Sequence, residues 1–336
     1  MKPILKDLGI QWEFLENKIS VGVEDQVIRI NSMLDLQEYK RLLEHLYPDN
    51  KEEISRVITI ISQMSGYTKV LYEFDNPNFI DLKNNKKFIF RKLIPWTFKF
   101  LYTLRKQTQY SLPMEDFIKD KVSNQSMVDI ILQHFFRKTP THFALGYFYV
   151  YMDYFYPKSG TGALSNLLKE KILERRGEII LNTEIDAIVP SRSVIIDAEG
   201  NEYQYDHLIW AADLKKMYHI LQTEELETVT QSEIATLSKR MQAAKGAESV
   251  FIFNIAVNRP PSYFQQHGGE HLFYTPSSQG LGLTNQDERL DLIANFDKKS
   301  KKEVFDWLEK YIRLNTYEIS IRSEEHTSEL QSPNTI

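Results

Sequence analysis

The sequence predicts a mixed α/β fold, that is, α and β elements in an α+β arrangement, built from about two domains. Its 336 residues are 42% hydrophobic and 26% charged, a composition typical of globular proteins rather than disordered ones. At roughly 150 residues per domain, the length corresponds to about two domains. Apolar residues alternate in some segments and recur at helical spacing in others, so both strands and helices are expected.

The composition also excludes several classes of function. The chain has no cysteine, which excludes a disulfide scaffold, a thiolate metal site and a cysteine nucleophile. Its net charge of −5 provides no electrostatic footprint for nucleic acid. No apolar run approaches the roughly 20 residues of a spanning helix, and the first residues do not form a signal peptide. We therefore expect a cytoplasmic protein.

The C-terminal residues are set apart from the fold. Residues 322–332 match, codon by codon, the in-frame translation of a common sequencing-library adapter. We therefore expect residues 322–336 to be a foreign sequence and exclude them from the predicted fold. The natural gene is then expected to continue past Ile321.

Near the N-terminus the sequence predicts a β-hairpin followed by two helices. Apolar residues alternate over residues 12–30, on both sides of a polar turn. Asp35 is expected to cap a helix that ends before Pro48. Asp49 is expected to cap a second helix, which ends before Gly66.

A basic, aromatic stretch follows at residues 82–114, ahead of a helical pattern at residues 114–136. It contains no acidic residue, and its aromatic side chains are interleaved with Lys83, Lys86, Lys87, Arg91, Lys92, Lys99, Arg105 and Lys106. One interpretation is a solvated helix whose aromatic residues pack inward. The other is a surface over residues 83–106 that rests on an anionic membrane, which would make the protein peripheral to the bilayer. Base stacking with nucleic acid is the least favoured interpretation.

From residue 156 the pattern changes to strands combined with helices. Residues 156–162 predict a loop, and the apolar stripe of residues 164–173 predicts a helix with Gly177 at its C′ position. A later helix is expected at residues 301–312. The expected strands are residues 178–182, 185–189, 194–197, 203–205, 208–212, 250–257, 272–274 and 290–296.

Two motifs suggest chemistry, and both are incomplete. Gly160 and Gly162 open a helix and are followed by Glu184, the layout in which glycines admit a pyrophosphate and an acid binds the ribose. Ser165 stands at the third glycine position, however. The H-x-x-E-H order from His267 to His271 resembles a zinc peptidase motif, but its two central glycines cost a helix roughly 2 kcal/mol, so no metal site is expected.

Four segments together resemble a known family. Residues 156–164 (YPKSGTGAL) resemble a YPxGGxxxL loop, and residues 176–188 (RGEIILNTEIDAI) a GGxIxxNxxVxxI strand pair. Residues 205–213 (YDHLIWAAD) resemble a strand that returns to the dinucleotide in a small-residue turn, and residues 315–321 a segment after which members continue. In their order they resemble flavin-dependent oxidoreductases of the phytoene desaturase and carotenoid isomerase type, which are related to the amine oxidases.

This resemblance, which extends over most of residues 4–321, implies an internal fragment of such an enzyme. The N-terminal GxGxxG segment and the C-terminal segment of the family have no counterpart in the sequence. The implied fold is a partial FAD/NAD(P)-binding-domain-like sheet with a mixed-sheet and helical substrate domain. The implied regions are a substrate side at residues 1–155, part of the FAD-binding domain at 156–245, substrate-side strands and a helix at 246–321, and the adapter sequence at 322–336.

The resemblance also implies a cofactor and a reaction. Non-covalently bound FAD would exchange a hydride with an apolar, polyene or isoprenoid-like substrate, as in carotenoid biosynthesis, and the protein would supply binding and orientation. No catalytic side chain is implied. Because segments are missing, we expect this chain to have lost FAD binding and to be inactive. The implied cofactor contacts are Glu184, Ile185, Ala211, Ala212, Gly160 and Gly162.

Other interpretations remain open at this point. Ile185 can be a core residue of a sheet, the two alanines can serve close packing, and the two glycines can simply form turns. The chain can also derive from an amine oxidase-like flavoenzyme with a soluble substrate. A third alternative is a non-catalytic α+β module that binds a lipid with the aromatic residues of 147–155, which are otherwise expected to line a tunnel or pack in the core.

Overall fold

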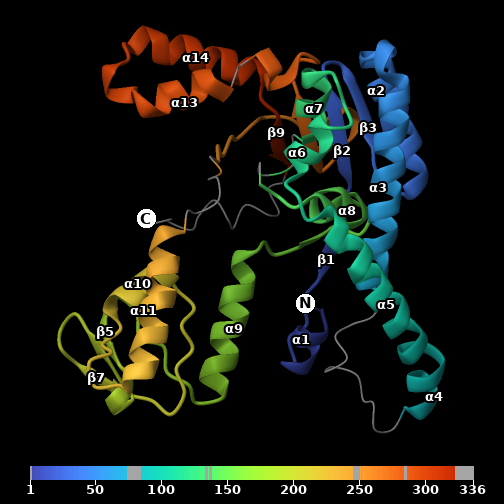
Figure 1. Ribbon diagram of the computed structural model, residues 1–336. Coiled ribbons are helices and arrows are strands. Elements are labelled where there is room, and N and C mark those ends of the chain that lie inside the picture. The colour runs from blue at the N-terminus through green and yellow to red at the C-terminus, as the bar shows by residue number, and fades with distance from the viewer. Residues whose placement is uncertain are drawn as a thin grey trace. The chain divides into compact units, whose positions relative to one another are not determined.

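The protein is described by a computed structural model, which confirms the mixed α/β class (Figure 1). The described residues are 2–73, 85–132, 135, 138–244, 250, 252–283 and 286–321. The chain forms two compact units: unit 1 consists of Met1–Leu167 with Ile252–Ile336, and unit 2 consists of Leu168–Phe251. The predicted adapter sequence at 322–336 lies outside the described residues.

Unit 1 is organised around a four-stranded mixed sheet with the strand order β3-β2-β8-β9. β2 (Ile19–Val23) and β3 (Gln26–Arg29) form the predicted hairpin. β2 also pairs in parallel with β8 (His271–Thr275), which pairs antiparallel with β9 (Tyr317–Ser320). Every residue of β2 is buried, as expected of a central strand that is covered on both faces.

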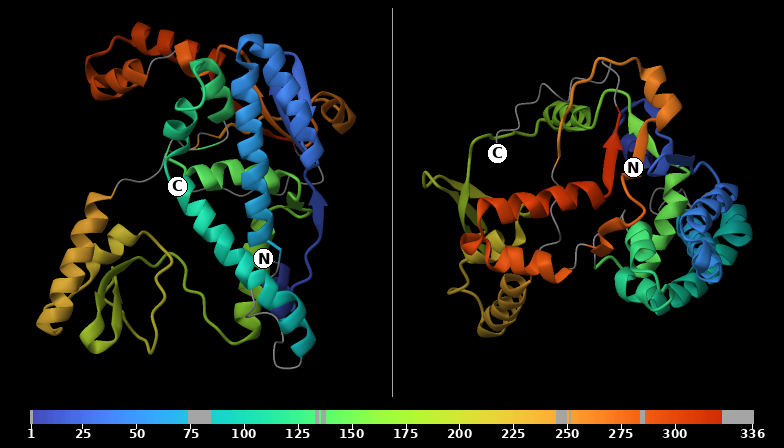
Figure 2. Two further views of the ribbon diagram at one scale, coloured as in Figure 1. Left: turned by 45° about the vertical axis from the view of Figure 1, so that its right-hand side comes forward. Right: turned by 90° about the horizontal axis from the view of Figure 1, so that it is seen from above.

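Three helices pack with this sheet in the core of unit 1 (Figures 1 and 2): α2 (Leu36–Leu46), α3 (Lys51–Leu71) and α8 (Thr141–Tyr151). Tyr39 of α2 packs against Phe148 of α8, with ring centroids 5.6 Å apart. Gly146 lets α8 approach α3 closely, because a Cβ atom at this position would lie 2.1 Å from Oγ1 of Thr68. The core therefore depends on close packing between segments that are far apart in the sequence.

The ends of these helices differ in part from the predicted ones. Asp35 is the residue before α2, as predicted. Asn50, not Asp49, is the N-cap residue of α3, because a 3-10 turn precedes this helix. Gly66 does not end α3, which continues to Leu71. A glycine inside a helix costs about 1 kcal/mol, and the buried face that continues to Val70 outweighs this cost.

The helix predicted at residues 114–136 is two helices, α6 (Met114–Lys119) and α7 (Gln125–Leu132). The Asn124 side chain accepts hydrogen bonds from the amides of Ser126 and Met127, at 3.0 and 3.2 Å. Asparagine in this position starts a new helix and so separates the two. Phe136, at the end of the predicted helix, lies outside the described residues.

Two predicted strands of the C-terminal part are wrong. Residues 252–257 are exposed and lie in no strand, and residue 251 is outside the described residues. The predicted strand at 290–296 instead overlaps α13 (Gln286–Ala294), because its leucines and alanine favour a helix. The predicted helix at 301–312 is confirmed as α14 (Lys301–Leu314), which begins with a capping box between Ser300 and Glu303.

Unit 1 contains further short elements. β1 (Phe14–Glu16) and β4 (Phe155–Pro157) form an antiparallel pair. The remaining helices are α1 (Lys2–Asp7), α4 (Lys86–Phe88), a π-helical turn (Ile89–Leu93), α5 (Ile94–Gln107) and α12 (Pro261–His267). The 3-10 turns are Met33–Asp35, Pro48–Asn50, Thr108–Tyr110, Gly280–Leu283 and Phe296–Lys298. Within the described part of the chain, no helix combines the length and the apolar character needed to cross a membrane.

Unit 2 contains an antiparallel meander of three strands, β5 (Ile185–Val189), β6 (Val194–Asp197) and β7 (Glu202–Gln204). A 3-10 turn (Pro190–Arg192) joins the first two strands. The turn between β6 and β7 is held by the carboxylate of Asp197, which accepts hydrogen bonds from both nitrogens of Asn201, from the Glu199 amide and from the Tyr203 hydroxyl. Two helices follow: α10 (Leu214–Ile220) and α11 (Thr228–Ala243).

The strands predicted at residues 178–182 and 208–212 are wrong. Neither segment pairs with a strand among the described residues, and both expose apolar side chains, with Leu181 69% and Ile209 88% exposed. An extended segment becomes a strand only when a neighbour takes up its backbone hydrogen bonds. The sheet of unit 2 is therefore an antiparallel meander and does not include the two strands that the family resemblance implies.

The helix before the meander, α9 (Gly162–Glu174), ends one residue earlier than predicted. Arg176, not Gly177, takes the left-handed conformation, with φ of 62°. The amide of Arg176 donates to the carbonyl of Leu173 at 2.9 Å, and that of Gly177 to the carbonyl of Ile172 at 2.8 Å. This is the hydrogen-bond pattern of a Schellman motif, with Arg176 at C′.

Candidate functional site

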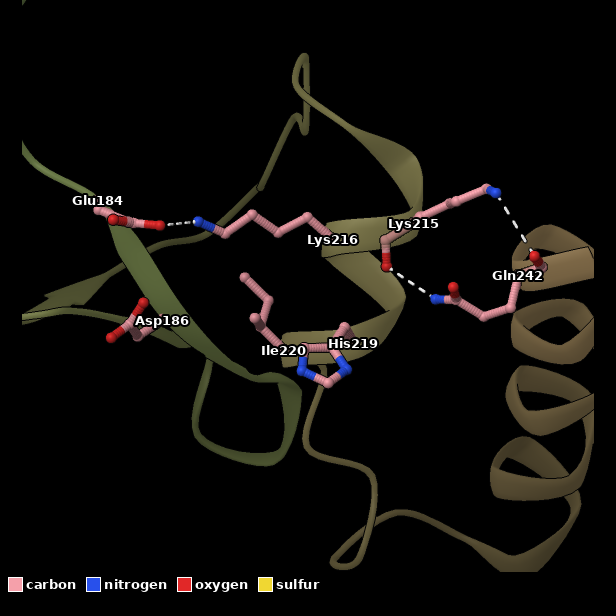
Figure 3. Close-up of a pocket in the computed structure, with 7 residues that line it drawn as sticks. All are labelled: Glu184, Asp186, Lys215, Lys216, His219, Ile220 and Gln242. Carbon is pink, nitrogen blue, oxygen red and sulfur yellow. Dashed lines mark hydrogen bonds and ion pairs between the residues drawn. The ribbon is translucent and has the colours of Figure 1, made fainter. Parts of the chain in front are cut away.

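The candidate site is an open pocket in unit 2 (Figure 3). Its side chains come from the start of β5, from α10 and from the end of α11. The lining residues are Glu184, Asp186, Lys215, Lys216, His219, Ile220 and Gln242. Most of them are charged or polar, so the pocket suits a polar ligand that forms hydrogen bonds rather than an apolar one.

Local hydrogen bonds fix α10 beside β5. The carboxylate of Asp213 caps the helix by accepting a hydrogen bond from the Lys216 amide at 2.8 Å. The indole of Trp210 donates to the Asp213 carbonyl at 2.9 Å, which holds the turn before the helix. Beyond the other end of α10, the Gln222 amide donates to the Ile188 carbonyl of β5 at 2.9 Å. Helix and strand therefore hold the two sides of the pocket in place.

Glu184 and Lys216 form an ion pair across the pocket (Figure 3). The hydrogen bond from the Lys216 ammonium, with its positive charge, lowers the pKa of the Glu184 carboxyl. Glu184 therefore stays ionised over a wider pH range than an isolated glutamate. Both side chains are partly or largely exposed, so the pair adds little to stability. The ion pair matters because it holds the Glu184 carboxylate ionised and in a fixed orientation at the pocket.

Lys215 joins α10 to α11. Its carbonyl accepts a hydrogen bond from the Gln242 side-chain amide at 3.1 Å, and its ammonium lies 3.4 Å from the Gln242 carbonyl. Two adjacent lysines in the first turn of a helix oppose the helix dipole, which favours anions there. Lys216 is compensated by Glu184. The pocket thus combines two carboxylates with two lysines, of which Lys216 is already paired with Glu184.

The structure brings four of the six predicted cofactor residues into unit 2. Glu184 lines the pocket, and Ile185 begins β5 opposite Asp197 of β6. Ala211 and Ala212 are exposed and lie directly before Asp213, the cap of α10. The start of β5 and the turn before α10 are therefore linked through the ion pair of Glu184 with Lys216.

The two predicted glycines belong to unit 1. Gly160 adopts φ of 79° in a turn that its amide closes on the Pro157 carbonyl at 3.0 Å, and Gly162 is the first residue of α9. The strand before this turn, β4, pairs antiparallel with β1. A dinucleotide-binding turn follows a parallel strand, so the arrangement around Gly160 lacks that feature.

Sequence reasoning missed Lys215, Lys216 and Gln242. A signal for the two lysines was present, because a lysine pair directly after a predicted small-residue turn is poorly placed for helix stability and needs another explanation. Gln242 has no such signal. Its role depends on the packing of α11 against α10, which the sequence does not reveal.

The other candidate residues have structural roles. His267 ends α12 and His271 lies in β8, so the two do not share a helix face. The Nε2 atom of His271 lies 3.1 Å from the Glu318 carboxylate of β9. Of the aromatic residues proposed to line a tunnel, Phe148 and Tyr151 are in the core of unit 1. These two residues therefore do not line an open groove.

Comparisons with known proteins do not assign a family. No protein-family model and no curated protein matches the chain. Among solved structures, the PF1083 protein of Pyrococcus furiosus is similar, with 10% sequence identity and a TM-score of 0.45, over 96% of this chain and 73% of that one. Similarity at this level says nothing about activity, so function must be inferred from the residues of the pocket.

Proposed function

We propose that unit 2 is the adenosine-binding part of an FAD-dependent oxidoreductase that acts on an apolar, isoprenoid-like substrate. One observation supports this most strongly. Glu184, the residue before β5, pairs with Lys216 in the first turn of α10, a helix that follows Ala211, Ala212 and the cap residue Asp213. The resemblance to flavin-dependent oxidoreductases assigns these separate segments to the same cofactor. In the structure, the ion pair of Glu184 with Lys216 links the segment before β5 to α10, the helix that follows the two alanines.

The residues of the pocket fit the adenosine end of such a cofactor. The ionised carboxylate of Glu184 can accept hydrogen bonds from ribose hydroxyls. Ala211 and Ala212 carry only methyl groups and are exposed, so their backbone is accessible to a ligand. Lys215 and Lys216 can attract a phosphate. The three strands described in unit 2 pair antiparallel, whereas a dinucleotide-binding turn follows a parallel strand, so we assign no pyrophosphate site.

FAD, when bound, supplies hydride exchange with a carbon–hydrogen bond of the substrate. The role of unit 2 is then to bind and orient one end of the cofactor. Glu184 provides the hydrogen-bond acceptor, and Lys216 keeps that acceptor ionised and directed across the pocket. Asp213 holds Lys216 in place through the cap of α10.

Titration with two halves of the cofactor tests the proposal. ADP carries the adenosine end of FAD, whereas FMN carries the flavin end without it. We expect ADP to shift the amide resonances of Ile185 and Asp213 in the isotope-labelled full chain, and FMN to leave them unchanged. Weak binding is expected, because only part of a cofactor site is assigned. The variant Glu184→Gln should weaken ADP binding, since a neutral amide accepts weaker hydrogen bonds from the ribose.

A matched control is Glu233→Gln, an exposed glutamate of α11 outside the pocket. It changes the net charge by the same amount and should leave ADP binding unaltered. If ADP fails to shift the pocket amides, or if FMN shifts them equally, the assignment of this pocket to adenosine is wrong. If both glutamine variants weaken ADP binding equally, the interaction is non-specific attraction rather than recognition by Glu184.

A further inference from the structure

One helical segment of unit 1 packs against α3 on one side and exposes apolar side chains on the other. α4, the π-helical turn and α5 continue one another from Lys86 to Gln107, and α4 extends past the end of α3 (Figures 1 and 2). Its inner side is fixed to α3. The Trp96 indole donates to the Val70 carbonyl at 2.8 Å and stacks on Phe100, with ring centroids 4.8 Å apart. Trp96 is therefore engaged with the rest of unit 1.

The outer side of the same segment is apolar. Phe90, Ile94, Phe98 and Leu101 are all exposed, and Phe98 is 71% exposed. Their spacing of four, four and three residues places them in one stripe along a helix. Single exposed apolar residues are ordinary, but a contiguous exposed stripe indicates that another surface covers it.

The charges around this stripe indicate the nature of the covering surface. From residue 85 to residue 114 the chain has seven cations and no acidic residue, although its net charge is −5. Lys92, Lys99 and Lys106 recur every seven residues and therefore lie along one edge of the helix. Arg91 and Arg105 lie closer to the stripe. The Lys99 ammonium pairs with the carboxylate of Glu73, two residues beyond the end of α3, at 3.3 Å.

We propose that the segment Lys86–Gln107 is a docking surface for an anionic phospholipid bilayer, on which the helix lies in the plane of the interface. The apolar stripe enters the boundary between headgroups and acyl chains, and the cations meet the headgroups. A bilayer fits better than a protein partner for two reasons. A fluid surface adapts to a convex helix without a preformed groove, and headgroups surround the helix on both flanks, which explains why acids are excluded along its whole length.

This proposal rests on unit 1 and does not require that unit 2 binds FAD. It refines the expectation from the sequence, because Trp96 faces α3 and the exposed stripe centres on Phe98 and Leu101. The acidic remainder of the chain is repelled by an anionic surface. The basic segment therefore also determines which side of unit 1 faces the bilayer.

Vesicle flotation of the full chain tests this proposal. We expect the chain to float with vesicles that contain phosphatidylglycerol, and not with pure phosphatidylcholine vesicles. Replacing Lys86, Lys87, Arg91 and Lys92 by Gln should lower the partition coefficient about fivefold for each cation removed. The double variant Phe98→Ser, Leu101→Ser should lower it about tenfold for each residue. Both variants should keep the far-ultraviolet circular dichroism of the parent, because the altered side chains are exposed.

A matched control comes from α14, which also exposes apolar residues but carries acids between its lysines. Phe305→Ser with Ile312→Ser should leave flotation unchanged. Equal loss in this control would refute the assignment to residues 86–107. Equal flotation with neutral vesicles, or none with anionic ones, would overturn the proposal. A chain that ignores vesicles but binds polyglutamate would have an acidic protein, and not a membrane, as its partner.

Discussion

Apolar segments of similar length have opposite outcomes in the two units. In unit 1, β2 is completely buried between β3 and β8. In unit 2, residues 178–182 and 208–212 are also rich in isoleucine and leucine, yet they form no strand and leave Ile180, Leu181 and Ile209 exposed. Local sequence does not separate these cases. The difference is that β2 has a partner on each edge, so an apolar run becomes a strand only when the fold provides neighbours for its backbone.

The largest expected contrast between the units is Ile61→Ala against Ile209→Ala. Ile61 of α3 is fully buried, so its truncation should lower the free energy of unfolding of unit 1 by about 2–5 kcal/mol. Ile209 is exposed, so its truncation should change the free energy of unfolding of unit 2 by less than about 0.5 kcal/mol. Native-state hydrogen exchange can follow amides of α3 and β5 separately. Equal losses would show that residues 208–212 are packed, contrary to the comparison.

A second contrast concerns the contact between α3 and α8. In Gly146→Ala the new methyl group overlaps Oγ1 of Thr68, and overpacking of this kind costs about 1–3 kcal/mol. Thr68→Ala removes that oxygen, so the double variant should recover most of the lost stability. Urea denaturation of the single and double variants gives the coupling free energy. Additive losses would show that α8 and α3 do not meet at this point.

The parts of the fold that were predictable are those decided by nearby residues. The hairpin of β2 and β3, the apolar stripe of α2 and the helix α14 depend on residues close in sequence, and all three were predicted. The parallel pairing of β2 with β8 was not, because the two strands are far apart in the chain and register depends on tertiary packing. Gly66 was misjudged for the same reason, since core packing overrode its low helix propensity.

In the candidate site, too, contacts between residues far apart in the sequence were not predictable. Glu184 could be identified from its place after a predicted strand, whereas its ion pair with Lys216 depends on the packing of α10 beside β5. Gly160 and Gly162 were predicted to form a turn before a helix, and they do. The sheet in which such a turn would act is not formed by the described residues. Local chemistry was therefore predictable, but the assembly of distant segments was not.

A third prediction concerns pH and compares one acid of each unit whose pKa is lowered by a hydrogen bond. Hydrogen bonds from Asn201, Tyr203 and Glu199 lower the pKa of Asp197 in the folded chain. Its contribution to stability is therefore complete above the unfolded pKa of about 3.9 and is lost as pH falls through the lower folded pKa. Asp197→Asn should destabilise the meander at neutral pH and remove this part of its acid sensitivity.

Thermal unfolding followed on methyl resonances of Val194 reports on unit 2 alone. In unit 1, the hydrogen bond from His271 lowers the pKa of Glu318, so methyl resonances near β9 should keep their acid sensitivity in the same variant. If acid lowers the unfolding temperature at Val194 equally in the parent chain and in Asp197→Asn, Asp197 does not control the stability of this turn.

The smallest expected effects lie at the end of α9, where backbone conformation rather than core packing determines stability. Arg176→Gly should stabilise the Schellman motif by about 0.5 kcal/mol, because glycine tolerates a positive φ. Gly177→Ala should act in the opposite direction, by about 1 kcal/mol, since its Cβ would lie 2.7 Å from Cγ2 of Ile172. Hydrogen exchange of the amide of residue 177 measures the change in local stability in both variants. Stabilisation by Gly177→Ala would mean that the helix end is loose, and that reduced chain entropy outweighs contact there.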